Sequence, residues 1–394
     1  MEINIDVSNT MNKESGWNDY YEDRILRIPA SYRARLGLCV GDFTHLKCVD
    51  GVHEMFQVAE AFREDVARNP NTAYATTKVY ESVVGGRSNS EIHLVSDITL
   101  GCDPEMYMVD RVSGNIVAAY RYLPKNGPIG HDGFLLEFRP NPSIHAYEVC
   151  DNLWKLICLA RKVFNKKPEG NRITIAAGSS YGGMTAGFHL HYGLPRGLLG
   201  RRPGTYNVAK LMTAAFDYYV GIPSILPEGN TDVTRRTAKH VRYGKPGEYR
   251  LDHRTFEFRM PGGVNMIHPV LARGLMSLGA VVAQDVASRI NTCTDSFTNL
   301  KELSSALDMR ELYPNLPDVG EFYATITSPD ISAARHHFET VKEDVRKMVG
   351  YEERAEDVEA YFEVLTRGLV FSNNVEHNWG GVYNAKQQGE MVVL

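Results

Sequence analysis

The stretch that decides the fold reads Gly187-Phe188-His189-Leu190-His191-Tyr192-Gly193. Its two histidines are two residues apart and alternate with apolar residues, and a glycine stands at each end. Strict alternation is typical of a β-strand, in which neighbouring side chains point to opposite faces. We therefore expect both imidazoles on one face of a sheet. Taken alone, such a pair is more often a pair of ordinary strand histidines than a set of metal ligands.

Three further stretches repeat the spacing of two residues with charged side chains. They are Asp103-Pro104-Glu105, Glu137-Phe138-Arg139 and Glu257-Phe258-Arg259. The last lies in a segment, residues 249–260, that reads as one strand. Each pair alone has a plainer explanation, because Asp-Pro-Glu is common in turns and Glu-x-Arg in surface ion pairs of small energetic value. Four such strands together indicate the wall of an active site.

Composition and charge exclude several classes of protein. The chain has 394 residues, 43% of them hydrophobic and 23% charged, with a formal net charge of −5. These values are typical of a soluble globular chain and argue against a protein that mainly binds nucleic acid. The six cysteines form no Cys-x-x-Cys pair, so a cysteine zinc site is not indicated. We find no signal-peptide core and no apolar run of transmembrane length, so we expect a cytoplasmic protein without a membrane partner.

We expect an α+β protein with three parts. Residues 1–90 would form a small β-rich N-terminal module, residues 91–294 the core with the four strand pairs, and residues 295–394 a helical extension packed on that core. Apolar periodicity predicts helices over residues 147–164, 207–220, 269–290, 300–307, 331–348 and 353–367. A strand is expected over residues 116–120 and a glycine- and proline-rich loop over 124–130. Residues 371–394 show no clear periodicity, and the basic loop over 235–245, taken alone, is expected to be a solvated face.

The N-terminal module contains the run Ile-Pro-x-x-x-Arg-x-x-Leu-Gly-Leu-x-x-Gly-Asp over residues 28–42. Within residues 24–50 the pattern predicts a strand, a short helical turn, a Gly-Asp turn and a second strand. The run resembles AbrB-type swapped-hairpin modules, which dimerise and often bind DNA. Three roles stay open for it: a structural addition, a contact in a homo-oligomer or with a partner, and DNA reading, for which it has basic residues.

The charged pairs point to metal-assisted chemistry. Carboxylates that share one face repel each other unless they are protonated or neutralised. The acidic and imidazole groups expected on this face are Asp103, Glu105, Glu137, His189, His191 and Glu257. A set with mostly oxygen donors suits Mg²⁺ or Mn²⁺ better than zinc. Arginines that could bind phosphoryl or carboxylate oxygens are Arg139, Arg242, Arg250 and Arg259. Together the two sets predict phosphoryl transfer from a nucleotide.

The order of the motifs resembles a known family. Gly-x-Asp-Pro-Glu, Glu-x-Arg-Pro, Gly-x-His-x-His-x-Gly, Arg-Tyr-Gly and Arg-x-x-Glu-x-Arg-x-Pro follow one another over about residues 98–290. This set is similar to that of glutamine-synthetase-like carboxylate–amine ligases, and most similar to the type 2 amidoligases of tailed bacteriophages. No phosphate loop of the Gly-x-x-x-x-Gly-Lys-Ser/Thr type and no kinase signature occurs. The resemblance implies a curved antiparallel sheet forming a funnel, with nucleotide entering one end and substrates the other.

The resemblance also implies roles for single residues. Asp103, His189 and Glu257 would bind one metal ion, and Glu105 and Glu137 a second. Asp103 stands where glutamine synthetase has Glu, and its shorter reach could weaken or shift the first ion.

The groups expected to contact anions come from the same comparison and from the arginines of the wall. Arg259 would contact the phosphoryl group or the acyl phosphate, and Arg242 or Arg250 the phosphates of ATP. Arg139 and His191 would face phosphate or substrate, and Gly187 would let substrate approach the backbone. The residues expected to carry catalysis are Arg259, Glu257 and Glu137.

We therefore expect an ATP-dependent ligase with two Mg²⁺ or Mn²⁺ ions. ATP would phosphorylate a small-molecule or peptide carboxylate, and an amine would attack the acyl phosphate to form an amide or peptide bond. If the chain is phage-encoded, this would take place in the host cytoplasm. One alternative is a DNA- or partner-binding regulatory protein whose ligase-like domain senses a metal and a nucleotide. Another is a metal-dependent hydrolase that uses the same wall.

Overall fold

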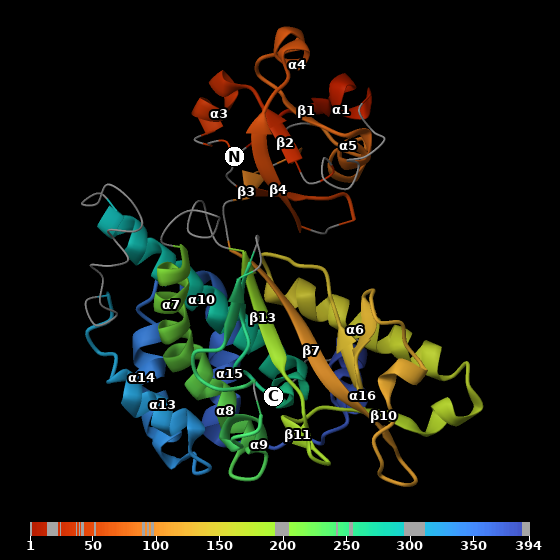
Figure 1. Cartoon of the computed structure of the whole chain (residues 1–394), viewed down its shortest axis with the longest axis vertical. Helices are drawn as coiled ribbons and strands as arrows, with labels where there is room; N and C mark the ends of the chain where they lie inside the picture. The colour runs from red at the N-terminus through yellow and green to blue at the C-terminus, as the bar shows by residue number, and fades with distance from the viewer. Residues whose placement is uncertain are drawn as a thin grey trace. The chain divides into compact units, whose positions relative to one another are not determined.

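The structure is a computed structural model of the chain (Figure 1). It describes residues 2–13, 23, 25–36, 38, 40, 43–50, 53–88, 91–92, 94–95, 98–193, 205–241, 243–251, 255–294 and 312–387. The chain divides into two compact units. The first comprises residues 1–97 together with 195–198, and the second the remainder of residues 98–394.

The first unit is built on a mixed six-stranded sheet in the order β1-β5-β2-β4-β3-β6. The strands are β1 Ile5–Val7, β2 Ile25–Ile28, β3 Phe43–Lys47, β4 His53–Glu60, β5 Ala73–Ala75 and β6 Leu94–Val95. The helices are α1 Asn9–Lys13, α3 Ala30–Leu36, α4 Arg63–Arg68 and α5 Thr77–Val83. Leu26, Phe56 and Val58 belong to its apolar core.

The stretch over residues 24–50 has the expected succession of strand, helix and strand, namely β2, α3 and β3. However, β4 lies between β2 and β3 and pairs with both. The two strands are therefore not bonded to each other and do not form a hairpin. The pattern of residues 24–50 could not reveal this, because the intervening strand comes later in the chain.

The second unit contains an antiparallel sheet in the order β14-β15-β13-β7-β9-β8, with β10 also paired to β7. The strands are β7 Thr99–Asp110, β8 Ile129–Asp132, β9 Leu135–Phe138, β10 Ile173–Ala176, β13 Phe188–Gly193, β14 Tyr249–Leu251 and β15 Phe256–Phe258. A small separate hairpin consists of β11 Ser180–Tyr181 and β12 Met184–Thr185. The expected α+β class with an antiparallel sheet and a β-rich start is confirmed.

Two strand predictions were wrong in detail. The segment over residues 249–260 is a hairpin of β14 and β15, in which Arg250 is directly opposite Glu257. Its apolar alternation continues on both sides of the reversal, so the pattern looks like one strand. Residues 116–120 supply only an isolated bridge at Ile116 and the turn η2 (Ala119–Arg121), whereas the end of the expected loop over 124–130 begins β8.

The apolar face of this sheet is covered by helices (Figure 1). Helix α10 (Pro269–Thr294) packs on β7 and β13, and the hydroxyl of Tyr192 donates a hydrogen bond to the carbonyl oxygen of Met276 (3.2 Å). Further elements that pack in this unit are α6 Ala146–Phe164, η3 Pro168–Arg172, α7 Thr205–Phe216, the π-helical turn η4 Asp217–Gly221, α8 Ile222–Ile225, η5 Leu226–Glu228, α9 Thr234–Thr237 and η6 Gly263–Met266. The helices predicted over residues 147–164, 207–220 and 269–290 are thereby confirmed.

Helix α10 corrects one statement made from the sequence. Its segment Pro269–Arg289 is long and apolar enough to cross a membrane by length and composition, although we expected no such run. In the structure, 83% of the most apolar 18-residue stretch of this helix is buried inside the protein. It is therefore the central core helix of this unit.

The end of the chain is helical. The helices are α13 Val319–Thr327, α14 Ser332–Val345, η7 Glu352–Arg354, α15 Ala355–Arg367 and α16 Val375–Gln387. Helices α14 and α15 were predicted, and the helix expected over 300–307 lies outside the described residues. Helix α16 was missed because packing partners, not an apolar stripe, hold it in place. Its Trp379 is buried, and Glu376 pairs with Arg161 of α6. The three-part division of the chain stays a prediction.

Candidate active site

The strand register brings the predicted charged residues to one face of the sheet. Across the strands, Glu105 is opposite Glu137, His189 is opposite Asp103, and His191 is opposite Glu257. Their neighbours Leu136, Phe188, Leu190, Tyr192, Phe256 and Phe258 are all fully buried. Because side chains alternate along a strand, one face is thus charged and the other is core. We call the six side chains Asp103, Glu105, Glu137, His189, His191 and Glu257 the wall.

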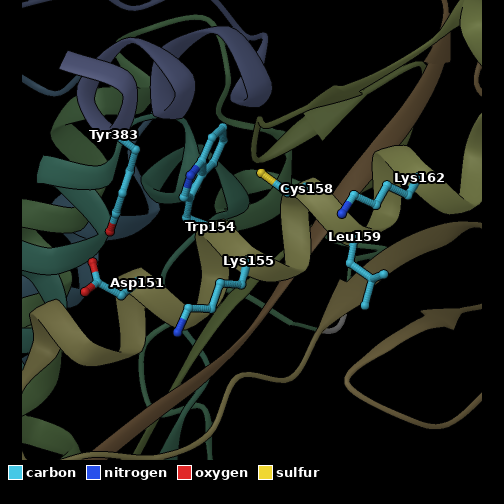
Figure 2. A pocket seen from close by; sticks show the side chains of 7 residues that line it. All are labelled: Asp151, Trp154, Lys155, Cys158, Leu159, Lys162 and Tyr383. Carbon is cyan, nitrogen blue, oxygen red and sulfur yellow. The ribbon is translucent and has the colours of Figure 1, made fainter. Parts of the chain in front are cut away.

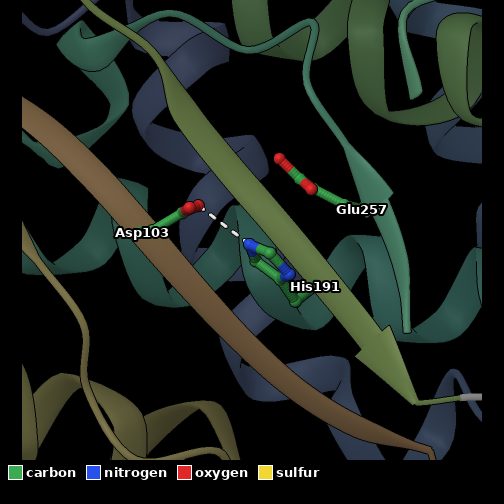
Figure 3. A group of neighbouring side chains, drawn as sticks. All are labelled: Asp103, His191 and Glu257. Carbon is green, nitrogen blue, oxygen red and sulfur yellow. Dashed lines mark hydrogen bonds and ion pairs between the residues drawn. The ribbon is translucent and has the colours of Figure 1, made fainter. Parts of the chain in front are cut away.

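Three members of the wall lie close enough to hold one metal ion (Figure 3). Ligand atoms of Asp103, His191 and Glu257 all lie within 4.8 Å of one another. The Nε2 atom of His191 is 2.9 Å from Oδ1 of Asp103. His189 is also near, with its Nδ1 atom 3.6 Å from Asp103 and 3.9 Å from Oε1 of Glu257. The structure therefore brings both imidazoles to the acids, whereas the sequence assigned the ligand role to His189.

Asp103 and His191 shift each other's pKa. Burial alone would raise the pKa of Asp103, but the neighbouring His191 and hydrogen bonds from both imidazoles lower it below its ordinary range. Burial alone would lower the pKa of His191, but the Asp103 carboxylate raises it. Each partner thus stabilises the charged form of the other, and a metal ion bound by His191 would compete with its proton.

Glu257 is the most deeply buried acid of the wall. Its carboxylate is flanked by Arg250 and by Nε of Arg259, which lies 3.1 Å from Oε1. Neither oxygen is aligned for a hydrogen bond with any described group, and both are shielded from solvent. The two arginines balance the charge of this carboxylate, but its oxygens have no aligned hydrogen bond, so they fit a site in which a cation also binds.

Glu105 and Glu137 form the second half of the wall. Oε2 of Glu105 accepts a hydrogen bond from the backbone N–H of Gly187 (2.7 Å), and Glu137 pairs with Arg139. Burial raises the pKa of Glu137 to about 7; Arg139 opposes this shift, while the charges of Asp103 and Glu105 add to it. Crowding of acids is therefore relieved here by protonation, and a divalent cation would relieve it in the same way. The donor set as a whole fits Mg²⁺ or Mn²⁺.

Gly187 has a steric reason to be glycine. A Cβ atom at this position would lie 2.5 Å from Nε2 of His189 and 2.6 Å from Nη2 of Arg235. The side chains of His189 and Arg235 therefore occupy the space that any other residue would need. The approach of substrate to this backbone stays a prediction.

The predicted arginines differ in exposure. Arg250 is 58% exposed, whereas Arg259 is largely covered and its guanidinium lies 4.3 Å above the ring of Tyr243. Arg139 donates to the carbonyl oxygen of Gly127 (3.0 Å) as well as pairing with Glu137. Arg242 lies outside the described residues.

Sequence reasoning missed two buried arginines, because the basic loop over residues 235–245 was expected to be solvated. Arg235 donates through Nη2 to the carbonyl oxygen of Arg259 (2.9 Å), and Arg236 donates through Nε to Oε2 of Glu228 (2.7 Å). Both side chains are buried, as is Glu228. Nothing in the spacing of this loop distinguishes its buried arginines from the exposed Lys239.

A cavity of about 550 Å³ lies elsewhere, between helices α6 and α16 (Figure 2). Its lining comprises Asp151, Trp154, Lys155, Cys158, Leu159, Lys162 and Tyr383. None of these belongs to the wall. We place the functional site at the wall because the unsatisfied acids and the guanidinium groups are there.

Comparison with protein families assigns the part of the chain that contains the wall to a known family. A model of the phage phiEco32-like COOH·NH₂ ligase type 2 family matches residues 100–380. The chain belongs to this family. The resemblance seen in the order of motifs is thereby confirmed, and so is the enzyme class, because the family is one of carboxylate–amine ligases. All six residues of the wall lie within the matched range.

Several solved structures are similar to this chain. A bifunctional glutathione synthetase from Pasteurella multocida matches with a TM-score of 0.44 and 14% identity, covering 75% of this chain and 51% of its own. The ligase PafA, in complex with the prokaryotic ubiquitin-like protein Pup, matches with a TM-score of 0.44 and 12% identity. The match covers 73% of this chain and 66% of the PafA chain. GmaS without ligand matches with a TM-score of 0.34 and 12% identity, and the match covers 70% of this chain and 78% of the GmaS chain. The chain thus spans about half the length of the glutathione synthetase. A comparison with curated proteins finds no match in sequence.

Proposed function

We propose that this chain is an ATP-dependent ligase that joins a carboxylate to an amine through an acyl phosphate. The observation that carries the proposal is the wall itself, four acids and two imidazoles on one sheet face with three arginines beside them. In a first step, a carboxylate oxygen of the substrate attacks the terminal phosphorus of ATP and ADP leaves. In a second step, the amine nitrogen attacks the acyl carbon, phosphate leaves and the nitrogen loses a proton.

The wall would hold the metal ions in this proposal. Asp103, Glu257 and one imidazole would bind one ion, and Glu105 with Glu137 a second. When bound, Mg²⁺ or Mn²⁺ would neutralise phosphate charge and polarise the phosphoryl oxygens. Support comes from the oxygens of Glu257, which have no aligned hydrogen bond, and from the raised pKa of Glu137.

The arginines would handle the anions. Arg259 is covered, stacked on Tyr243 and fixed beside Glu257, so its fork can face the transferred phosphoryl group without rearranging. Arg250 has a side chain that is 58% exposed and would reach the ATP phosphates, together with Arg242. Arg139, beside Glu137, and His191, beside Asp103, would face phosphate or substrate.

The substrates would be a small-molecule or peptide acid and an amine, in the cytoplasm. Neither nucleic acid nor a membrane has a part in the proposal. An oligomer through the first unit also stays a prediction.

The test is metal-dependent ADP formation with hydroxylamine as a generic amine, which converts an acyl phosphate to a hydroxamate that can be detected by its colour. We expect ADP and hydroxamate to form together from a panel of carboxylic acids. Glu137→Gln and Glu257→Gln should each lower the rate by about 10²-fold or more, since each removes a carboxylate that would hold a metal ion beside the transferred phosphoryl group. Glu363→Gln, on the exposed surface of α15, is the matched control.

Two outcomes would contradict the proposal. One is full turnover in both wall variants. The other is phosphate or amide cleavage without ATP consumption, which would instead indicate the metal-dependent hydrolase.

A further inference from the structure

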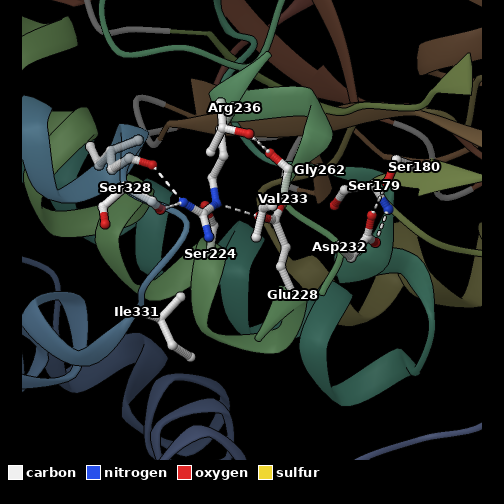
Figure 4. Close-up of polar contacts among 12 residues, drawn as sticks. Ser179, Ser180, Ser224, Glu228, Asp232, Val233, Arg236, Gly262, Ser328 and Ile331 are labelled. Carbon is white, nitrogen blue, oxygen red and sulfur yellow. Dashed lines mark hydrogen bonds and ion pairs between the residues drawn. The ribbon is translucent and has the colours of Figure 1, made fainter. Parts of the chain in front are cut away.

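Two neighbouring arginines of helix α9 contact different elements, and Figure 4 shows the contacts of the second, Arg236. Arg235 reaches the end of β15, where its Nη2 atom donates a hydrogen bond to the carbonyl oxygen of Arg259 (2.9 Å). Arg236 reaches the C-terminal helices, where Nη1 donates to the carbonyl oxygens of Ile326 (2.9 Å) and Ser328 at the end of α13. One short helix thus connects the end of β15 with a helix outside the sheet.

Arg235 is buried without a direct counter-ion. Arg235 is only 2% exposed, and among the described residues no carboxylate forms an ion pair with it. Its Nε atom also lacks a hydrogen-bond partner within the described part of the chain. The charges of Glu105 and Glu228 act on Arg235 without a direct contact, and a buried guanidinium that lacks a direct partner is costly, which favours a functional role for this arginine.

The main chain of Arg259 is held from two sides. Its N–H donates to the carbonyl oxygen of Glu248 (3.1 Å), and its own carbonyl oxygen accepts from Arg235. The loop before β14 packs directly on Arg235, because a Cβ atom at Gly244 would lie 2.5 Å from Cγ of Arg235. Loss of Arg235 would therefore free one side of the Arg259 peptide and leave a gap under this loop.

A clasp fixes this segment to the C-terminal helices. We define the clasp as Arg236, its buried partner Glu228, and the end of α13. Nearby, the N–H of Ile331 donates to Oδ1 of Asn230 (3.1 Å), and Asp217 accepts from the N–H of Gly247 (2.7 Å) and from Tyr323 of α13. These contacts hold both ends of the segment between α8 and β14.

We propose that Arg235 is a positioning residue for Arg259. It holds the main chain of Arg259 at the end of β15, so that the Arg259 guanidinium stays aimed at the transferred phosphoryl group, and the clasp keeps Arg235 in place. Helix α13 is then part of the apparatus that aligns the site. This role rests on the proposed function of Arg259.

The first test does not depend on activity. Hydrogen–deuterium exchange is measured on full-length wild type, Arg235→Met and Arg235→Lys. We expect amides of residues 256–262 to exchange about tenfold faster in Arg235→Met, because the local opening becomes easier. Arg235→Lys, which keeps one donor, should restore part of the protection. Arg172→Met, which removes a half-exposed arginine paired with Asp110, is the control and should leave this segment unchanged. Wild-type exchange in a folded Arg235→Met would overturn the proposal.

The second test uses kinetics of ADP formation. Arg235→Met should lower kcat by about 10²-fold with the KM values for ATP and the carboxylate unchanged, because small displacements of a positioned group cost about that much. In an Arg259→Ala background, Arg235→Met should have no further effect, since Arg235 acts through Arg259. Arg236→Lys, which weakens the clasp, should show a smaller fall of kcat of the same kind.

Independent, additive losses in the double variant would overturn the proposal. So would a raised KM for the carboxylate with kcat unchanged, which would make Arg235 a substrate-binding residue. If wild type itself forms no ADP, the proposed function fails, whereas the exchange experiment still decides whether Arg235 positions Arg259.

Discussion

Single residues of the wall set its charge balance. Asp103 and His191 stabilise each other's charged forms, whereas Glu137 lies among acids and is driven toward its neutral form. The i, i+2 spacing predicted that both histidines share a face with the acids. It could not predict which imidazole comes nearer to Asp103, because that depends on strand twist and on the rotamers that neighbouring side chains allow.

The Asp103–His191 pair gives a prediction that can be checked by NMR titration. Asp103→Asn should lower the pKa of His191, because the carboxylate that raises it is gone while burial, which lowers it, remains. The resonance of His337, on α14, is the internal control. An unchanged titration of His191 would contradict the geometry of the pair.

Glu137 gives a prediction for stability against pH. Its pKa of about 7 in the folded chain is above its ordinary value of 4.5, so the folded state binds more protons between these values. Stability should therefore fall as pH rises from about 4.5 to about 7. Glu137→Gln cannot ionise, and it should flatten this fall. Urea unfolding with a chelator present, at pH 5 and pH 8, measures the difference.

The same experiment contains its control. Glu363→Gln should follow the wild-type pH profile, because that side chain is exposed on α15. Adding Mg²⁺ at pH 8 should stabilise wild type more than Glu137→Gln, since an ion that binds only the folded state raises its stability. Equal pH profiles for wild type and Glu137→Gln would show that Glu137 is not forced toward its neutral form.

At the scale of elements, close packing decides what the pattern cannot show. The alternation of charged and apolar residues along β7, β9 and β13 predicted which side chains share a face of the sheet. The long helices α6 and α10 were predicted from apolar periodicity. The β14–β15 hairpin was missed because the alternation continues across it. Helix α16 was missed because its contacts, such as the buried Trp379 and the Arg161–Glu376 ion pair, come from distant parts of the chain.

Helix α10 lies so close to the sheet that it allows no side chain at Gly279. A Cβ atom there would lie 2.0 Å from the hydroxyl of Tyr192, so Gly279→Ala should destabilise the protein by about 1–3 kcal/mol. The matched control is Gly381→Ala on α16, where nothing lies within 4 Å of a Cβ atom. It should stabilise the chain by up to about 1 kcal/mol, because alanine favours a helix over glycine. Thermal unfolding of both variants checks the contrast.

At the scale of the whole molecule, the fold class and family could be predicted because the motifs occur in a fixed order along the chain. The order of strands in the sheet could not be derived from periodicity, since pairing joins residues as far apart as Glu105 and Glu137, or His191 and Glu257. The two arginines of α9 also escaped prediction, because burial of a charged side chain depends on what the rest of the fold places around it.

The division into two compact units predicts that the second folds alone. All wall residues lie in residues 98–394, and the first unit has its own apolar core. A chain of residues 98–394 should therefore unfold cooperatively and keep ADP formation within about threefold of wild type, as expected for domains with separate cores. Circular dichroism melting and the ADP assay check both statements. An aggregated product, or one without a cooperative transition, would show that the first unit is needed for folding.

The alternation in β13 also limits how the gene can change in length. Deleting or inserting a single codon between those for Phe188 and Tyr192 would reverse the faces of the residues on one side of the change, so that a histidine would face the core or an apolar neighbour would leave it, in a strand that is paired on both sides. A change of two codons would keep the faces in phase. Homologous chains should therefore vary in length between these strands, in the turns, and hardly ever by an odd number of residues within them.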